Sequence, residues 1–227
     1  MTIITTTGLT RAAGISAAVA GALFIAVQIN HPPMDVASVA TTEWVVRNSA
    51  KVVMAALALA GITGMYLRQV RQVGLLGLVG YLLFGAGYLL MFSTEVISAD
   101  VLPGLVHLAP GYVNDVVVAA AGGTPVGDIG AMKTVLAVTG IGYMVGGLIF
   151  GIALFRARIL ARWASALLAV GTVATASLAV LPECFNRPMA VPVGVALIGL
   201  GISLWRDQRA QAPETAVATT RIEHASV

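Results

Sequence analysis

Long apolar stretches separated by short polar segments run along the whole chain. Six of them approach the roughly 20 residues that an α-helix needs to cross about 30 Å of hydrocarbon, and they cover residues 12–29, 44–67, 73–94, 135–155, 163–181 and 190–205. They are rich in Ala, Leu and Gly and lack the alternation of period two that marks barrel strands. The pattern therefore predicts an all-α polytopic membrane bundle of about six transmembrane helices, formed by residues 1–206 as a single unit.

The polar segments between these stretches predict the connections. Residues 68–72 and 156–162 form short loops on one side of the membrane, and residues 31–43 and 95–131 form longer connections on the other. Within the longest connection, residues 110–121 predict a short interfacial or re-entrant helix. Residues 207–227 lack periodicity and are rich in Ala, Thr, Gln and Glu, so we expect a disordered cytoplasmic tail. The first stretch is expected to be an uncleaved anchor, because no convincing small-residue cleavage site follows it.

The charges fit a membrane protein and orient it. Charged residues make up only 10% of the 227 residues, against about 25% in a soluble chain. Nine of the thirteen basic residues flank one side of the stretches, which the positive-inside rule places in the cytoplasm with the N-terminus: Arg11, Arg68, Arg71, Arg156, Arg158, Arg162, Arg206, Arg209 and Arg221. The net charge of +3 therefore reflects topology. We expect the lipid bilayer as a partner and no nucleic acid.

Several motifs of cofactor and metal chemistry are missing from the sequence. It contains no Walker-type loop, no GxGxxG segment ahead of a helix, no HExxH motif and no DDxxD-like cluster that would hold a magnesium-diphosphate group. The single cysteine, Cys184, excludes an internal disulfide framework and a CxxC metal site. We therefore expect neither a metal nor a cofactor.

The second stretch begins with unusual charges. Arg47 and Lys51 are four residues apart, so they share one helix face, with Asn48 beside them and Trp44 one turn earlier. Charges at membrane depth are costly and usually face a bundle interior or a wet cavity. Three interpretations stay open: the pair reaches up to the outer interface with Trp44 as an aromatic anchor, it binds a polar or anionic substrate group, or it holds carboxylates in place.

The third stretch carries an aromatic stripe that ends at an acid. Spacings of 3, 4, 4 and 3 place five residues on one helix face: Tyr81, Phe84, Tyr88, Phe92 and Glu95. Ring faces attract cations, so the stripe is consistent with a cavity that handles a cation beside a carboxyl group. The alternative is a packing or lipid-facing stripe whose acid simply reaches the interface.

Other polar residues fall on the same outer side. His31 and Asp35 are four residues apart, but Pro32 and Pro33 intervene, so a metal site from this pair is not expected. Asp35 is a candidate for the outer mouth of a cavity, and Asp115 lies near the start of the short helix that we expect as a lid. The acids and bases Asp128, Lys133, Glu183 and Arg187 fit an ordinary solvated surface.

Small residues recur along the fourth stretch. Gly142 and Gly146, and Gly147 and Gly151, each form a GxxxG motif, which permits close backbone approach between helices. This pattern predicts packing, either within the bundle or in a homodimer through this helix.

Several segments resemble a group of small actinobacterial integral membrane proteins. The segments that carry the resemblance are His31-Pro32-Pro33, Thr41-Thr42-Glu43-Trp44, Gly61-Ile62-Thr63-Gly64-Met65-Tyr66-Leu67-Arg68-Gln69-Val70, Gly77-Leu78-Val79-Gly80-Tyr81-Leu82-Leu83-Phe84 and Gly146-Gly147-Leu148-Ile149-Phe150-Gly151. Some members look like the membrane-bound terpene cyclases of indole-sesquiterpenoid pathways such as the drimentines, which implies a place in the bacterial cell membrane. Where common members have a His after Trp44-Val45-Val46, this chain has Arg47-Asn48.

The resemblance implies a proton-initiated cyclisation of a farnesylated indole-type substrate in secondary metabolism. On that hypothesis Glu95 is the acid, and Asp35 or Asp115 returns the proton or orients Glu95. The stripe residues stabilise the cation, and the remaining polar candidates bind the substrate head: Arg47, Asn48, Lys51, Trp44 and His31. Two alternatives stay open, a small transporter or permease subunit with an ionisable pathway in its outer half, and a non-catalytic membrane protein.

Overall fold

The computed structural model describes residues 5–179 and 187–207, and it confirms the all-α prediction for them. The longer helices are α1 (Thr6–Ala26), α3 (Thr42–Arg68), α4 (Val70–Val96), α7 (Ala131–Ala157) and α8 (Arg162–Ala174), followed by a final helix, Pro188–Asp207. The shorter elements are α2 (Val36–Val39), α5 (Leu102–Leu105), α6 (Pro110–Ala120), the π-helix η1 (Ile97–Val101) and the 3₁₀ turns η2 (Thr175–Ala179) and η4 (Pro188–Ala190). The predicted tail lies outside the described residues, except for Asp207.

Five helices of the described chain are long and apolar enough to cross a membrane, which makes this an integral membrane protein. They are Thr6–Ala26, Thr42–Arg68, Val70–Leu105, Ala131–Ala157 and Pro188–Asp207. The expected span 163–181 differs, because α8 has only 13 residues and gives way to η2 at Thr175. The hydroxyls of Thr172, Thr175 and Ser177 there donate to carbonyls of the preceding turn. Residues 180 and 181 of that expected span lie outside the described ranges.

The third span is much longer than predicted. After a kink at Gly74, where φ is 55°, the chain stays helical through η1 to Leu105, so the connection expected to begin at residue 95 begins after Leu105. Apolar Ile97 and Leu102 explain the difference, because they pack in a second core cluster with Val113 and Val117 of α6. Packing against α6 therefore keeps the chain helical beyond residue 95, where its polar residues had suggested that the helix ends. The short helix expected at 110–121 is confirmed as α6.

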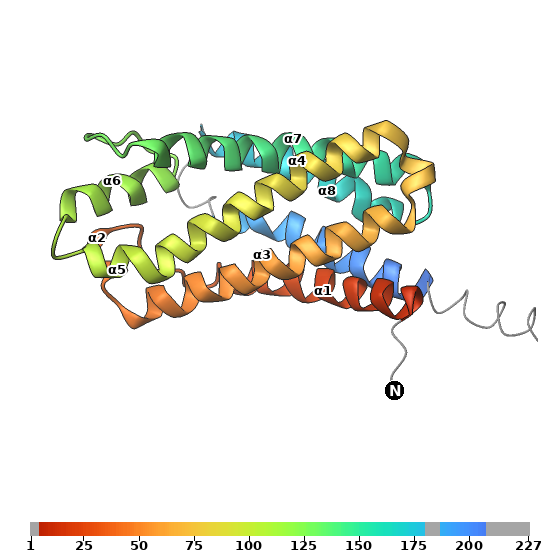
Figure 1. Cartoon of the computed structure of the whole chain (residues 1–227), viewed down its shortest axis with the longest axis horizontal. Helices are drawn as coiled ribbons and strands as arrows, with labels where there is room; N and C mark the ends of the chain where they lie inside the picture. The colour runs from red at the N-terminus through yellow and green to blue at the C-terminus, as the bar shows by residue number, and fades with distance from the viewer. Residues whose placement is uncertain (1–4, 180–186, 208–227) are drawn as a thin grey trace, which may run out of the picture.

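The long helices lie side by side, as Figure 1 shows. α1 runs beside α3, and α3 and α4 form an antiparallel pair, while α7 lies along α4 and contacts α8. The start of α1 and the turn between α3 and α4 lie at one end of the bundle, and α2, α5 and α6 gather at the other. We call the latter the α6 end. Six of the predicted cytoplasmic arginines belong to the opposite end, since Arg11 lies in the first turns of α1 and the others flank the α3–α4 and α7–α8 turns: Arg68, Arg71, Arg156, Arg158 and Arg162. Arg209 and Arg221 lie outside the described residues.

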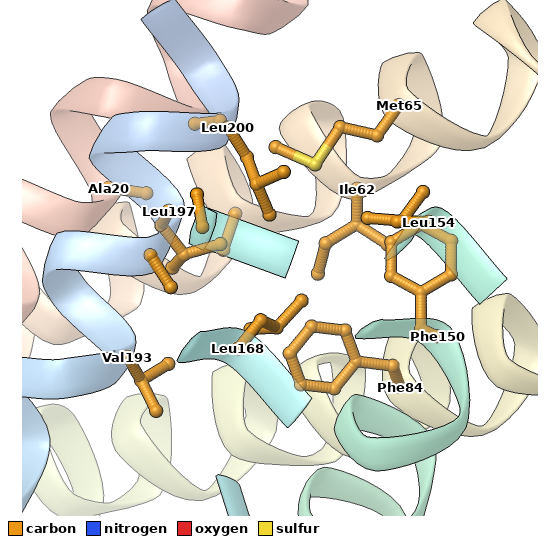
Figure 2. Close-up of a cluster of buried hydrophobic side chains, with 14 of the residues drawn as sticks. Ala20, Ile62, Met65, Phe84, Phe150, Leu154, Leu168, Val193, Leu197 and Leu200 are labelled. Atoms are coloured by element: carbon orange, nitrogen blue, oxygen red, sulfur yellow. The ribbon is translucent and has the colours of Figure 1, made fainter. Parts of the chain in front are cut away.

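The main apolar core joins α1, α3, α4, α7, α8 and the final helix. Figure 2 shows Ile62, Phe84, Phe150, Leu168 and Leu197 converging from five of these elements. Each of these side chains is fully buried. In a bilayer, where lipid is as apolar as the core, such packing depends on close fit rather than on removal of water.

Both GxxxG motifs of α7 are used inside the chain. A Cβ at Gly142 or Gly146 would meet the backbone of α4, near Gly87 and Phe84. A Cβ at Gly147 or Gly151 would meet α8. These glycines are buried, so the face that we considered for a homodimer is covered by the protein's own helices.

Candidate functional site

Two hollows lie next to each other at the α6 end. The first is a cavity of about 230 Å³ between α1, α3, η1 and α6, which we call the polar cavity. Its polar lining comes from Gln28, Asn48, Lys51, Glu95, Ser98 and Arg187, and its apolar lining includes Phe24, Trp44, Met54 and Met91. The second is a hollow of about 610 Å³ between α4, η1, α6 and α7, which we call the lateral groove. Met91, Glu95 and Ser98 belong to the walls of both.

An ion pair joins α3 to α4 across the polar cavity. Lys51 Nζ lies 3.6 Å from Glu95 Oε2 and donates a hydrogen bond of 2.9 Å to Asn48 Oδ1. Asn48 is buried, and its Nδ2 donates to the Trp44 carbonyl, which fixes the orientation of the amide. The Lys51 and Glu95 side chains are 13% and 20% exposed. The structure thus places an ammonium and a carboxylate together, within spans of mainly apolar composition.

Trp44 fixes the turn that follows Glu95. In η1 the hydrogen bonds run from residue i+5 back to residue i, as from the Leu102 N–H to the Ile97 carbonyl. The next carbonyl, of Ser98, would take its bond from residue 103, but Pro103 has no N–H. Trp44 Nε1 supplies the missing donor at 2.8 Å, and its ring is almost fully buried. A side chain of α3 therefore satisfies a carbonyl that the sequence of η1 leaves open.

Replacing Trp44 by Phe is expected to lower the free energy of unfolding by about 1–3 kcal/mol through the unsatisfied Ser98 carbonyl, in addition to lost ring packing. Pro103→Ala restores a backbone N–H at residue 103, so it should recover part of the loss in the Trp44→Phe background. Thermal unfolding of the four proteins of this cycle in detergent checks the expectation. If Pro103→Ala changes the stability equally in both backgrounds, the carbonyl is not the link between the two residues.

Arg47 caps α1 instead of facing the polar cavity. Its Nη1 donates to the Ile29 carbonyl at 2.7 Å and to the Val27 carbonyl at 3.3 Å, which are groups left open past the end of α1. Its other nitrogens bind Glu43, with Nη2 2.8 Å from Oε1. The predicted role of Arg47 in binding the substrate head is therefore corrected: the guanidinium holds the α1 end against α3.

The aromatic stripe packs within the bundle. Phe84 and Tyr88 are fully buried against Tyr143 of α7, and Tyr81 stacks on Tyr66 of α3 with ring centroids 4.5 Å apart. Phe92 also packs against the main core, and none of the four stripe aromatics lines the polar cavity or the lateral groove. The predicted cation-binding lining is thus corrected to a packing stripe. Its acid differs, because Glu95 and Met91, one turn earlier, do reach both hollows.

The two other candidate acids hold local backbone. Asp35 caps α2 by accepting the Ser38 N–H at 2.7 Å, and this bond holds the pKa of Asp35 below its usual value. Asp115 accepts the N–H groups of Gly127 at 2.8 Å and Val126 at 3.2 Å, which likewise lower its pKa. Neither carboxylate lines the polar cavity or the lateral groove. Their predicted role of returning a proton to, or orienting, Glu95 is therefore corrected to a structural one.

His31 packs behind Trp44. The ring meets that of Trp44 edge-on with centroids 6.2 Å apart, and Nδ1 lies 2.8 Å from the Pro32 carbonyl, to which the Nδ1–H tautomer donates. Burial, with the positive charge of Lys51 as the next cause, lowers the pKa of His31 from 6.5 to about 4. The ring is thus neutral at pH 7 and does not line the polar cavity, so its predicted place in the substrate site is corrected. Among the described residues no group of three His, Cys, Asp or Glu side chains could hold a metal.

The pKa of His31 gives stability a pH dependence. Because its pKa is lower in the folded chain than in the unfolded one, the unfolded state binds more protons between pH 6.5 and about 4. The contribution of His31 should therefore be complete above pH 6.5 and fall steadily as the pH falls toward 4. Thermal unfolding of the protein and of a His31→Gln variant at pH 7 and pH 5 measures it. Equal losses for both proteins would contradict the assignment.

Arg187 is the functional candidate that sequence reasoning placed wrongly. We expected an ordinary solvated surface, whereas the structure places Arg187 in the wall of the polar cavity, where Nη1 donates to Gln28 Oε1 at 3.2 Å. Burial lowers its pKa, and the negative charge of Glu95 opposes that shift. Its only sequence signal was its place before Pro188, at the start of the final helix.

The lateral groove opens on the lipid-facing side of the bundle. Ile141 lines it and is 58% exposed. In Figure 1 α4 crosses α7 obliquely and diverges from it toward the α6 end, and the residues that line the groove come from these diverging parts. The helices touch where Gly87 meets Gly142, and the groove lies beyond this contact, with residues of α6 and the following loop as a further wall.

No protein-family model, curated protein or solved structure matches this chain. The fold and the site define a class nonetheless. This is an α-helical integral membrane protein with an ion pair at the junction of a polar cavity and a lipid-facing apolar groove.

Proposed function

We propose that the protein is a membrane-bound terpene cyclase that closes the prenyl chain of an indole-type substrate by protonation, with Glu95 as the acid. One observation carries the proposal: Glu95 lines both hollows. In the polar cavity water can deliver a proton to it, and in the lateral groove an apolar chain can lie beside it. A transporter would have to pass its substrate from one hollow into the other. A cyclase needs only the Glu95 carboxyl group beside a chain that lies in the lateral groove.

The size and lining of the groove suit such a chain. Its volume of about 610 Å³ falls within the range of roughly 300–1,000 Å³ typical of small-molecule pockets. Apolar groups such as Met91, Leu136 and Met144 make up most of its wall. These side chains exclude water, and a carbocation intermediate requires that exclusion.

The ion pair supports the acid chemistry. When Glu95 gives up a proton, the Lys51 ammonium 3.6 Å away stabilises the carboxylate left behind. The O–H bond of Glu95 breaks as a C–H bond forms at the terminal alkene, and the next double bond of the chain attacks the resulting cation. Loss of a proton from carbon to the Glu95 carboxylate ends the reaction, so substrate and product are isomers. An epoxide would react in the same way, with oxygen as the protonated atom.

The stabilising groups differ from those that the stripe suggested. Within the described residues, Trp44 and Phe24 are the aromatic side chains that line the polar cavity. Neither of them lines the lateral groove, where the prenyl chain lies, so the Glu95 carboxylate that remains after protonation is the group that stabilises the cation there.

The test uses membranes that contain the protein, incubated with a farnesylated indole and analysed by mass spectrometry and NMR for an isomeric product. Glu95→Gln should reduce product at least 100-fold, the lower end of what general acid catalysis contributes. Asp100→Asn is the matched control, because this acid lies five residues later in the same continuous helix and is exposed. Wild-type rates in Glu95→Gln, or gradient-driven uptake into vesicles without chemical change, would overturn the proposal.

A further inference from the structure

The walls of the polar cavity carry more positive than negative charge. Lys51 and Arg187 line the cavity, and Glu95 is the single acid among the described residues that does so. Glu95 lies 3.6 Å from Lys51, whereas Arg187 forms no ion pair with a described residue. Two cations against one acid leave one positive charge in excess.

Three acids near the α6 end are bound elsewhere and do not cancel this charge. Glu43 pairs with Arg47. Asp35 accepts the Ser38 N–H, and Asp115 accepts two N–H groups of the loop after α6. A charge without a partner is costly in a site of mainly apolar composition, so the cavity favours an anion that comes from outside the protein.

Hydrogen-bond donors are in excess as well. The Arg187 guanidinium has five N–H groups, and the bond from Nη1 to Gln28 Oε1 at 3.2 Å is the one that it makes to a described residue. That bond uses the amide oxygen of Gln28, and Nε2 of the same amide has no partner within the described ranges. An anion, which only accepts hydrogen bonds, matches such a lining.

The volume of the cavity limits the size of the anion. Its volume of about 230 Å³ compares with roughly 30 Å³ for one water molecule in the liquid, so a small ion fits together with a few waters. Pockets that hold drug-sized molecules are larger, at roughly 300–1,000 Å³. The polar cavity therefore suits a small ion and not a prenylated molecule.

We infer that the polar cavity binds a small monoanion between Lys51 and Arg187, with the Gln28 amide as a further donor. Chloride and short carboxylates such as formate share the required chemistry, which is a single negative charge and acceptor lone pairs. The inference goes beyond the proposed function, because this anion is neither substrate nor product and the prenyl chain lies in the lateral groove.

Glu95 competes with the anion for the same cations. Its carboxylate lies beside Lys51, and it opposes the lowering of the Arg187 pKa that burial causes. Removing the charge of Glu95 should therefore strengthen anion binding. A unit charge about 4 Å away changes an affinity about fivefold even at the dielectric constant of water, so we expect at least this gain.

The experiment measures thermal unfolding of the full chain in an uncharged detergent at pH 7 and constant ionic strength. Sodium gluconate, whose anion is bulky, is replaced stepwise by sodium chloride or by sodium formate. A small anion that binds should raise the unfolding temperature along a saturable curve, by about 3–6 °C at ten times its dissociation constant. Line broadening in chloride-35 NMR and saturation-transfer NMR of formate measure binding directly.

Variants with opposite expected effects test the position of the site. Arg187→Gln should weaken the anion at least tenfold through the loss of a charge-assisted hydrogen bond, whereas Glu95→Gln should strengthen it about fivefold or more. Lys133→Gln is the matched control, because it removes an exposed cation of the α6 end that does not line the polar cavity. Unfolding of each variant in gluconate alone separates a change in stability from a change in anion affinity.

The outcomes decide the inference in both directions. Stabilisation by formate alone identifies a carboxylate site, stabilisation by chloride identifies a site for inorganic anions, and each supports the inference. It is overturned by the lack of a saturable shift with either salt, by equal binding in Arg187→Gln, by an equal loss in Lys133→Gln, or by weaker binding in Glu95→Gln. These measurements include no product assay, so the anion site and the cyclase proposal can fail independently of each other.

Discussion

Gly146→Ala is expected to destabilise the bundle strongly, although it adds a single methyl group. The new Cβ would overlap the backbone of Leu83 and Phe84 on α4. Backbone atoms cannot rotate away, so α4 and α7 would have to separate and loosen the buried contacts of Phe84 with Tyr143 and Phe150. We expect a loss of about 3 kcal/mol in the free energy of unfolding, the upper part of the usual range for overpacking.

Gly140→Ala is the matched control for that change. It lies on the same helix, six residues earlier, and a Cβ there meets nothing within 4 Å. Ala is favoured over Gly in a helix by up to about 1 kcal/mol, so this variant should unfold at the same temperature as the wild type or higher. Thermal and denaturant unfolding in one detergent compare the three proteins. Equal stability of the two variants would mean that α4 and α7 do not approach as closely as described.

Lys51→Met is expected to cost both stability and activity, whereas the double variant Lys51→Met, Glu95→Gln should regain stability only. Removing the ammonium leaves the Glu95 carboxylate without its nearest cation in a largely apolar site. Removing one partner of a buried ion pair lowers the free energy of unfolding by roughly 3–5 kcal/mol. We expect about 3 kcal/mol here, since both side chains keep some exposure to the polar cavity.

The double variant removes that unpaired charge and replaces the pair by neutral groups of similar size. Its free energy of unfolding should return to within about 1 kcal/mol of the wild type, while product formation stays abolished for lack of an acid. Unfolding and product assays on all four proteins give the coupling energy. A double variant no more stable than Lys51→Met would show that the two groups do not interact.

Much of this fold could be predicted because helix length and composition depend on local sequence. Apolar runs of about 20 residues predicted the long helices, and Pro110 with the apolar run after Asp115 predicted α6. The extension of α4 could not be predicted, because Glu95 and Asp100 suggested an exit from the membrane. What keeps the chain helical is burial of Ile97 and Leu102 under α6, which is a contact between distant segments.

The candidate site was predicted in part, for a similar reason. Lys51 stood out as a charge at membrane depth and Glu95 as the acid at the end of the aromatic stripe, but only the fold shows that they form an ion pair. The stripe spacing identified one face of α4 without indicating which neighbour covers it, and that neighbour is α7. Arg187 comes from the start of the final helix, and no local pattern distinguishes it from a solvated arginine.

The close contact between Gly87 and Gly142 also acts as a depth stop for the ligand. It closes the inner end of the lateral groove at a fixed point, since neither backbone can give way. Glu95 lies eight residues after Gly87 on α4, which is about 12 Å of helix at 1.5 Å per residue, so the carboxyl group stands beside the groove and not at its inner end. The meeting of two glycines, which looks like simple packing, thereby limits how deep an apolar chain can enter the bundle, while the position of Glu95 along the groove determines which carbon of the chain meets the acid.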